Sequence, residues 1–199
     1  MANSDPKTDL HRYLREARAS LLWKLDGLSE YDARRPLTPT GTNLLGLVKH
    51  LAAMELGYFG STFDRPMADV PAWATAEGMM AEPNVDMWAT AAEPREYITG
   101  WYERACAHAD ATIEALEIDS PGHVPWWRPG HNEVSLHRIL VHMIAETDRH
   151  GGHADIVREL IDGAAGLRAD NSNLPDEDAD WWAAYRDRIE QAARAAAGS

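Results

Sequence analysis

The chain of 199 residues is 45% hydrophobic and 26% charged, an ordinary globular composition and enough length for one domain with a full core. Its 32 acidic residues outnumber 19 basic ones, for a formal net charge of −13, which argues against nucleic acid or an anionic membrane as partner, because both require a basic face. No apolar run has membrane-spanning length and the first residues lack the apolar segment of a signal peptide, so we expect a cytoplasmic protein.

The first half of the chain predicts two amphipathic helices. The first covers residues 7–28, where apolar residues recur every three or four positions: Leu10, Leu14, Ala17, Leu21, Leu25 and Leu28. A loop rich in proline and glycine follows at 31–42. Thr42 or Asn43 can then cap a second helix, whose apolar residues are Leu44, Leu47, Val48, Leu51, Met54 and Tyr58.

The second half begins with residues 61–93, which we interpret as a long ordered loop with short helical pieces, because its aromatic residues need a surface to pack on. Pro94 opens a third helix at 94–117, and a loop at 118–132 leads to a long helix at 133–162 that ends at Gly163. After a polar connection at 164–177, a last helix at 178–196 carries Trp181, Trp182, Tyr185 and Ile189 on or near one face.

These elements predict an all-α fold. The chain shows no alternating strand pattern, and four main helices plus a terminal one indicate a four-helix bundle with a C-terminal helix, in a single domain of residues 1–199. The long connection between the second and third helices argues against simple up-and-down topology. It allows a crossover that sets neighbouring helices parallel.

Cys106 is the single cysteine, so an internal disulfide is impossible and a reducing compartment suits the chain. It lies in the middle of the predicted helix 94–117, with no obvious neighbour that would lower its pKa. We therefore interpret Cys106 as an ordinary helix residue in preference to a catalytic nucleophile.

Glu146 and His150 are the most informative pair in the sequence. Residues four apart on a helix point the same way, one turn above the other. At about 100° per residue, this face also carries Ile139, Met143, Val157, Leu160 and Ile161, so we expect it to be buried. A buried carboxylate without a partner is very costly, and a metal ion suits both a carboxylate and an imidazole.

His50 also faces the core, because it lies three residues after Leu47 and four before Met54. A single histidine on an apolar face is more often a core residue than a ligand, but helix bundles build metal sites from facing helices. Two histidines and one carboxylate suit zinc, ferrous iron, nickel or manganese and leave coordination positions open. Two interpretations remain: a catalytic metal site, or a buried hydrogen-bonded Glu–His pair without metal.

Two further histidines share the stripe of Glu146 and His150. His142 lies one turn before Glu146, and His153 lies close to one turn beyond His150. Either can be a ligand in place of Glu146, since imidazole is the more frequent ligand. We expect His153 to support a ligand from behind or to face substrate, and His142 to pack or to support a ligand.

Two segments, residues 39–52 around His50 and residues 136–163 around Glu146 and His150, resemble the DinB-like superfamily, most closely an actinobacterial branch long classed as a domain of unknown function. The resemblance covers about residues 8–165. It implies a four-helix bundle with one long crossover, often dimeric, with a metal held by one histidine of the second helix and two ligands of the last bundle helix.

Carried over by motif, the resemblance implies His50, Glu146 and His150 as metal ligands. Many members use three histidines. Glu146 makes this chain similar to mycothiol-dependent maleylpyruvate isomerase, whose zinc site is His, Glu, His. The chain departs from the commoner motif at His153, where glutamine is frequent, so the resemblance assigns His153 no role.

The resemblance also implies thiol chemistry, because relatives transfer mycothiol or bacillithiol to electrophiles or isomerise with such a thiol. We expect a metal-dependent mycothiol-type S-transferase. The alternatives are a thiol-dependent isomerase of the maleylpyruvate type, which the absence of a separate C-terminal domain disfavours, and a non-enzymatic dimer that binds metal or a small molecule. Trp126, Trp127 and Arg128 either line the mouth of the site or pack on the rim of the bundle.

Overall fold

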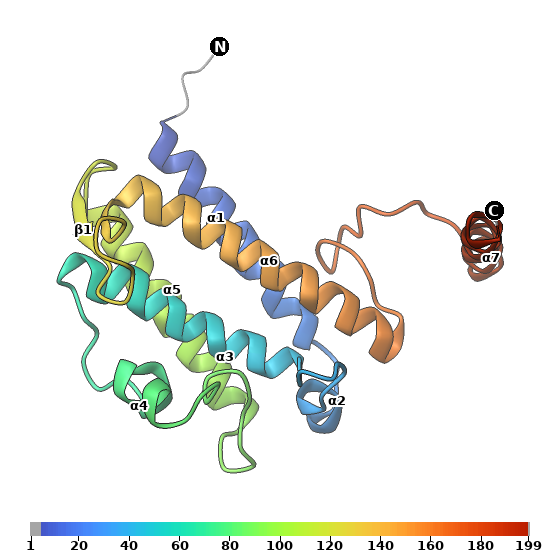
Figure 1. Cartoon of the computed structure of the whole chain (residues 1–199), viewed down its shortest axis with the longest axis horizontal. Helices are drawn as coiled ribbons and strands as arrows, with labels where there is room; N and C mark the ends of the chain where they lie inside the picture. The colour runs from blue at the N-terminus through green and yellow to red at the C-terminus, as the bar shows by residue number, and fades with distance from the viewer. Residues whose placement is uncertain (1–4, 199) are drawn as a thin grey trace.

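The computed structural model describes residues 5–198, and its architecture is the predicted helical bundle (Figure 1). Four long helices form the bundle: α1 (Pro6–Leu22), α3 (Leu44–Glu55), α5 (Arg95–Ala115) and α6 (Leu136–Asp162). Shorter elements are α2 (Glu30–Arg34), α4 (Ala76–Ala81), a π turn at Leu56–Gly60, and 3₁₀ turns at Trp23–Leu25, Ser61–Phe63 and Ala72–Ala74. The C-terminal helix α7 (Ala179–Ala197) follows the bundle.

Capping residues set the starts of the two helices that carry the candidate site. Asn43, one of the two predicted caps, accepts a hydrogen bond from the Gly46 N–H of α3 at 2.7 Å. Ser135 accepts from the Arg138 N–H of α6 at 3.3 Å. The helix predicted at 7–28 ends earlier than expected, because the chain tightens to a 3₁₀ turn after Leu22 and Gly27 then adopts a left-handed φ of 73°.

The bundle is not an up-and-down bundle. Arg158, near the end of α6, donates to the carbonyl oxygens of Lys24 and Asp26 just after α1, so α1 and α6 run parallel. Lys7 at the start of α1 donates to the Leu116 carbonyl after α5, so α5 runs opposite to both. Since α3 also runs opposite to α6, α3 and α5 are parallel neighbours, as the long crossover predicted.

The crossover, residues 61–94, is ordered and carries the expected short helical pieces, including α4. Its last part lies directly on the first turns of α3. Gly46 permits this approach, because a Cβ there would lie 1.9 Å from the Met87 carbonyl oxygen. Lys49 of α3 donates to the Trp88 carbonyl at 2.9 Å and pairs with Glu93 at 3.0 Å. These contacts hold the crossover against one end of the bundle.

A short hairpin corrects the expectation of a chain without strands. β1 (Pro121–His123) pairs antiparallel with β2 (Glu133–Ser135), so α6 starts at Leu136 and not at residue 133. Strands of three residues are too short to show alternation in a sequence. The loop of this hairpin packs on the π turn after α3, where a Cβ at Gly57 would lie only 3.0 Å from the Trp126 ring.

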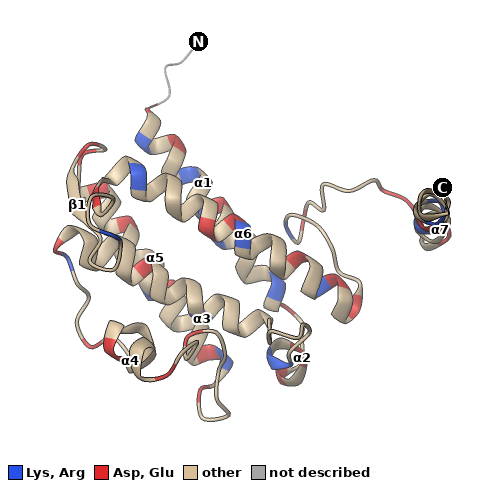
Figure 2. Cartoon of the chain, in the orientation of Figure 1, with Lys and Arg blue, Asp and Glu red and all other residues tan. Residues whose placement is uncertain are grey.

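The C-terminal helix α7 follows the polar connection after α6 (Figure 1) and has no buried residue in the described part of the chain. Its Trp182 and Ile189 line a surface hollow of about 750 Å³ together with Glu159 at the end of α6. Trp181, Trp182 and Tyr185 lie together on it, with Trp181 and Tyr185 stacked at a centroid distance of 5.2 Å. Basic and acidic residues are interspersed along α1, α6 and α7 (Figure 2). Among residues 5–198, no helix has both the length and the hydropathy that crossing a bilayer requires.

Candidate metal centre

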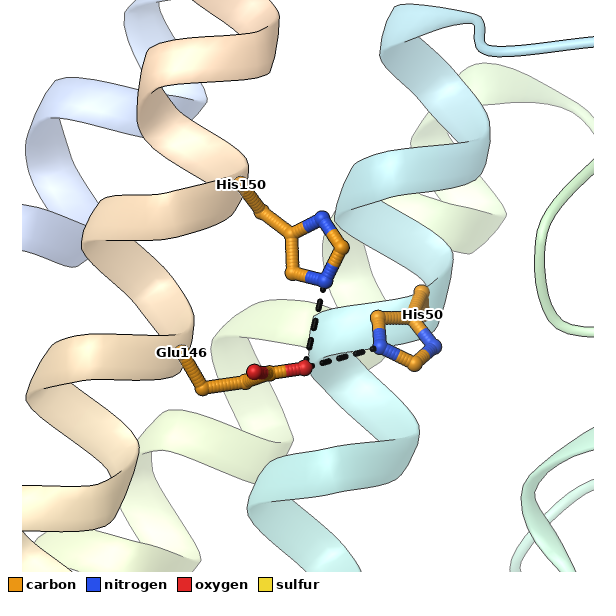
Figure 3. Close-up of side chains that lie close together, drawn as sticks. All are labelled: His50, Glu146 and His150. Carbon is orange, nitrogen blue, oxygen red and sulfur yellow. Dashed lines mark hydrogen bonds and ion pairs between the residues drawn. The ribbon is translucent and has the colours of Figure 1, made fainter.

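Three side chains from two helices converge between α3 and α6 (Figure 3). His150 Nε2 lies 3.2 Å and His50 Nε2 lies 3.6 Å from the same oxygen, Glu146 Oε1. The two imidazole rings meet edge to face, with centroids 4.9 Å apart. One ligand atom from each of the three residues lies within 4.8 Å of the other two. The structure therefore brings together the three residues that the sequence singled out.

The site is less buried than its helical stripe predicted. The side chains of His50 and His150 are 15% and 11% exposed, but that of Glu146 is 27% exposed. Ile139, Met143 and Val157 are buried as expected, whereas Leu160 is 66% exposed. The reason is that α6 packs far more extensively on α1 than on α3, so the flank of α6 beside the site stays open. The carboxylate therefore keeps contact with solvent.

The electrostatics of the site favour metal-binding protonation states. Burial alone would raise the pKa of Glu146, but the imidazoles of His150 and His50 outweigh it, and the pKa of Glu146 is lowered. Burial lowers the pKa of His150, and His50 lowers it further against the opposing effect of Glu146. At neutral pH the helix α6 thus offers an ionised carboxylate and a neutral imidazole, the forms in which both groups bind metal.

The donor set fits a divalent cation. Imidazole nitrogen and carboxylate oxygen are ligands for zinc, iron, nickel and manganese. The ion-pair partners that the structure shows for Glu146 within residues 5–198 are the imidazoles of His50 and His150, and no lysine or arginine there neutralises its charge. A cation held by His50, Glu146 and His150 would do so.

An aromatic cluster of Tyr58, Trp126, Trp127 and His142 borders this site. The indole N–H groups of Trp126 and Trp127 donate to the Tyr58 hydroxyl at 3.4 Å and 3.1 Å. The ring of His142 lies 4.6 Å from that of Tyr58 and 5.1 Å from that of Trp127. His142 precedes Glu146 by one turn, which is about 6 Å along the helix. The cluster is therefore adjacent to the three convergent side chains.

Residues Trp126, Trp127, Arg128 and His131 line a surface hollow of about 440 Å³ on the hairpin loop. Trp126 is 49% exposed and Arg128 is also exposed, while Trp127 is partly buried against Tyr58. The tryptophans pack on the rim of the bundle and also leave an accessible aromatic surface. That this surface lines the mouth of the metal site stays a prediction.

His142 packs in the aromatic cluster, and burial, the main cause, lowers its pKa. His153 is exposed and lies edge-on to His150 at a centroid distance of 5.4 Å, so it neighbours the site without joining the three convergent atoms. Cys106 is a free thiol on α5 whose pKa is raised, chiefly by burial. A raised pKa opposes thiolate formation and agrees with an unreactive helix cysteine.

Asp86, a residue of the crossover, also contacts the site, although the sequence did not point to it. Its carboxylate lies 2.6 Å from His50 Nδ1, on the side of the ring away from Glu146, and the residue is only 7% exposed. Burial would raise the pKa of Asp86, but the hydrogen bond and charge of His50 outweigh this and lower it. An aspartate in an irregular loop carries no periodic signal, so its contact with His50 could not be read from spacing.

A helical bundle with a long crossover, with two histidines and a carboxylate gathered on its second and last main helices, is consistent with the DinB-like class of bundles that the sequence resembles. The sequence profile of the mycothiol S-transferase family matches residues 9–163, which span the bundle from α1 to the end of α6. The chain belongs to this family, a DinB-like branch. A search of curated proteins found no match.

The lowered pKa values lead to a pH prediction. Protons compete with metal at the imidazoles, so metal affinity should fall as pH drops below about 6, under the ordinary imidazole pKa of about 6.5. Because the pKa of Glu146 is lowered, its carboxylate stays ionised over the same range, and the loss reports the histidines. Calorimetric titration with zinc between about pH 8 and about pH 5 measures this. An affinity that stays constant over that range contradicts histidine ligation.

Proposed function

We propose that this chain is a metal-dependent S-transferase that uses a low-molecular-weight thiol of the mycothiol type and acts on an electrophile. The observation that carries the proposal is the convergence of His50, Glu146 and His150 on one point in a chain of the mycothiol S-transferase family. Zinc is the metal we expect, because two imidazoles and one carboxylate form one of its three-ligand catalytic sets; nickel, iron and manganese suit the same donors.

The chemistry needs a thiolate at neutral pH, and a divalent metal with an open coordination position lowers the pKa of a thiol bound to it. The residues of the chain would hold the cation and leave a coordination position open for the thiol. His50 and His150 supply neutral nitrogen donors, and Glu146 supplies negative charge. The 27% exposure of Glu146 supports access for a small thiol from solvent. Cys106, with its raised pKa, is not needed as a nucleophile.

We assign substrate contacts to the exposed surface of the hairpin loop. Trp126 and Trp127 offer aromatic faces next to the site, and Arg128 offers a positive charge at the hollow they line. Aromatic rings provide large contact area to an apolar or planar electrophile. His153 is a second candidate for a substrate contact, because its exposed ring lies beside His150. A homodimer and a cytoplasmic location remain predictions from the resemblance and the composition.

The proposal is tested by thiol-dependent turnover. Protein of measured metal content is incubated with mycothiol and monochlorobimane, and fluorescence of the conjugate is followed. We expect turnover that needs both thiol and metal, that stops after chelation, and that returns when zinc is restored. Metal-replete protein that shows no turnover with mycothiol or any of several other thiols contradicts a transferase. Metal binding without turnover supports the non-enzymatic alternative.

A further inference from the structure

The two histidines of the candidate site differ in what lies behind their rings. His50 has Nε2 toward Glu146 and Nδ1 within 2.6 Å of Asp86 Oδ2. His150 also has Nε2 toward Glu146, but its buried Nδ1 has no hydrogen-bond partner among the residues that the structure describes. Only one of the two rings is therefore held at both nitrogens by carboxylates within residues 5–198.

The position of Asp86 is determined by contacts that do not involve the site. The next residue, Met87, crosses α3 at Gly46, and its carbonyl accepts a hydrogen bond from the Asn43 side chain at 3.1 Å. The residue after that, Trp88, accepts from Lys49 at 2.9 Å. The crossover thus contacts α3 at two consecutive residues, Met87 and Trp88, and these contacts fix the backbone that places Asp86 beside His50.

We propose that Asp86 is a positioning residue for the metal site: it accepts the Nδ1 hydrogen of His50, which leaves Nε2 unprotonated and directed at Glu146. The inference rests on the proposed function for its metal. Its physical basis is that a neutral imidazole carries one hydrogen on one of two nitrogens, and a carboxylate at Nδ1 selects the tautomer whose Nε2 has a free lone pair. Carboxylates behind metal-ligating histidines also make the ring a stronger donor.

Asp86 also adds negative charge to the site. Its carboxylate and that of Glu146 lie on opposite sides of the His50 ring. A divalent cation at the site would be balanced by these two negative charges. The crossover, which lies outside the four bundle helices, thus contributes to the site through the buried side chain of Asp86.

Measuring the tautomer of His50 tests the proposal directly, because an Asp86 that served only folding would not determine which nitrogen of His50 carries the hydrogen. Two-bond ¹H–¹⁵N correlation spectra of metal-free protein at about pH 8, where imidazole is neutral, distinguish Nδ1–H from Nε2–H. The His50 signals are identified by their loss in His50→Gln. We expect Nδ1–H in the wild type and a substantial Nε2–H population in Asp86→Ala. The signals of His150 should not change, because Asp86 does not contact that ring.

Metal affinity is the second readout, measured by competition with a chromophoric zinc chelator. Loss of a carboxylate behind a ligating histidine typically costs about 10- to 100-fold in affinity. Asp86→Asn, which keeps an acceptor but removes the charge, should lie at the low end of that range, and Asp86→Ala at the high end. Glu93→Gln is the matched control, because it removes another carboxylate that ties the same crossover to α3, through Lys49. It should leave zinc affinity within about twofold of wild type, outside the range expected for Asp86 variants.

The outcomes separate the inference from the proposed function. Asp86→Ala protein with the wild-type His50 tautomer and wild-type affinity overturns the inference. An equal loss of affinity in Glu93→Gln also overturns it, since the effect would then come from a loosened crossover. Wild-type protein that takes up no zinc contradicts the proposed function, and the tautomer measurement then still decides whether Asp86 orients His50.

Discussion

Glu146→Ala is expected to abolish stoichiometric metal binding while leaving the bundle folded. The change removes the one anionic ligand on which both imidazoles converge, so metal affinity should fall by at least about 100-fold, or about 2.7 kcal/mol. Alanine is the best helix former, and the partly exposed Glu146 side chain leaves little cavity behind, so the helix should persist. Mass spectrometry measures the loss of metal, and circular dichroism measures separately whether the bundle stays helical.

Glu159→Ala is the control for this variant, because it removes an exposed glutamate from the same helix, away from the site. It should keep both metal and thiol-dependent turnover. If Glu146→Ala instead unfolds the protein, and the wild type never carries metal under any loading condition, the pair of Glu146 and His150 is a structural hydrogen-bonded pair and not a metal site.

Glu55→Ala is expected to cause the largest loss of stability. Arg18 on α1 makes two hydrogen bonds to Glu55 on α3, at 2.7 Å and 2.6 Å, and a third to Asp110 on α5 at 2.6 Å. Burial alone would lower the pKa of Arg18, but the charge of Glu55 outweighs it and holds the pKa above its ordinary value. Removing Glu55 leaves a buried guanidinium with one carboxylate partner fewer, which costs about 3–5 kcal/mol.

Urea denaturation measures this loss as a shift in midpoint. The double variant Arg18→Met with Glu55→Leu should recover most of the stability, because apolar residues of similar volume replace a buried ion pair with little net cost. Arg12→Ala, which removes an exposed i,i+4 pair with Glu16 on the same helix α1, should leave the midpoint unchanged. A Glu55→Ala protein as stable as the wild type would show that the three-helix ion network contributes nothing.

Local rules predicted most of the helices and the site's core residues. A spacing of three and four residues places Glu146 and His150 on one face of α6 and His50 on the inward face of α3. This placement does not depend on which other helices pack against them. The helix caps at Asn43 and Ser135 are also local features, since each side chain accepts a hydrogen bond from the backbone N–H three residues later. Hairpin strands of three residues, by contrast, lie below the length at which a period can be seen.

Sequence by itself thus determined the bundle, its crossover and the three side chains that point inward, because helical periodicity fixes the direction of a side chain within its own element. Only the tertiary structure decided how open the site is, that Trp126 and Trp127 contact Tyr58, and that Asp86 lies behind His50. Arg18, Glu55 and Asp110 likewise come from three different helices. The physical reason is that such contacts depend on the path of loops and the packing of separate helices, for which neighbouring residues in the chain carry no periodic signal.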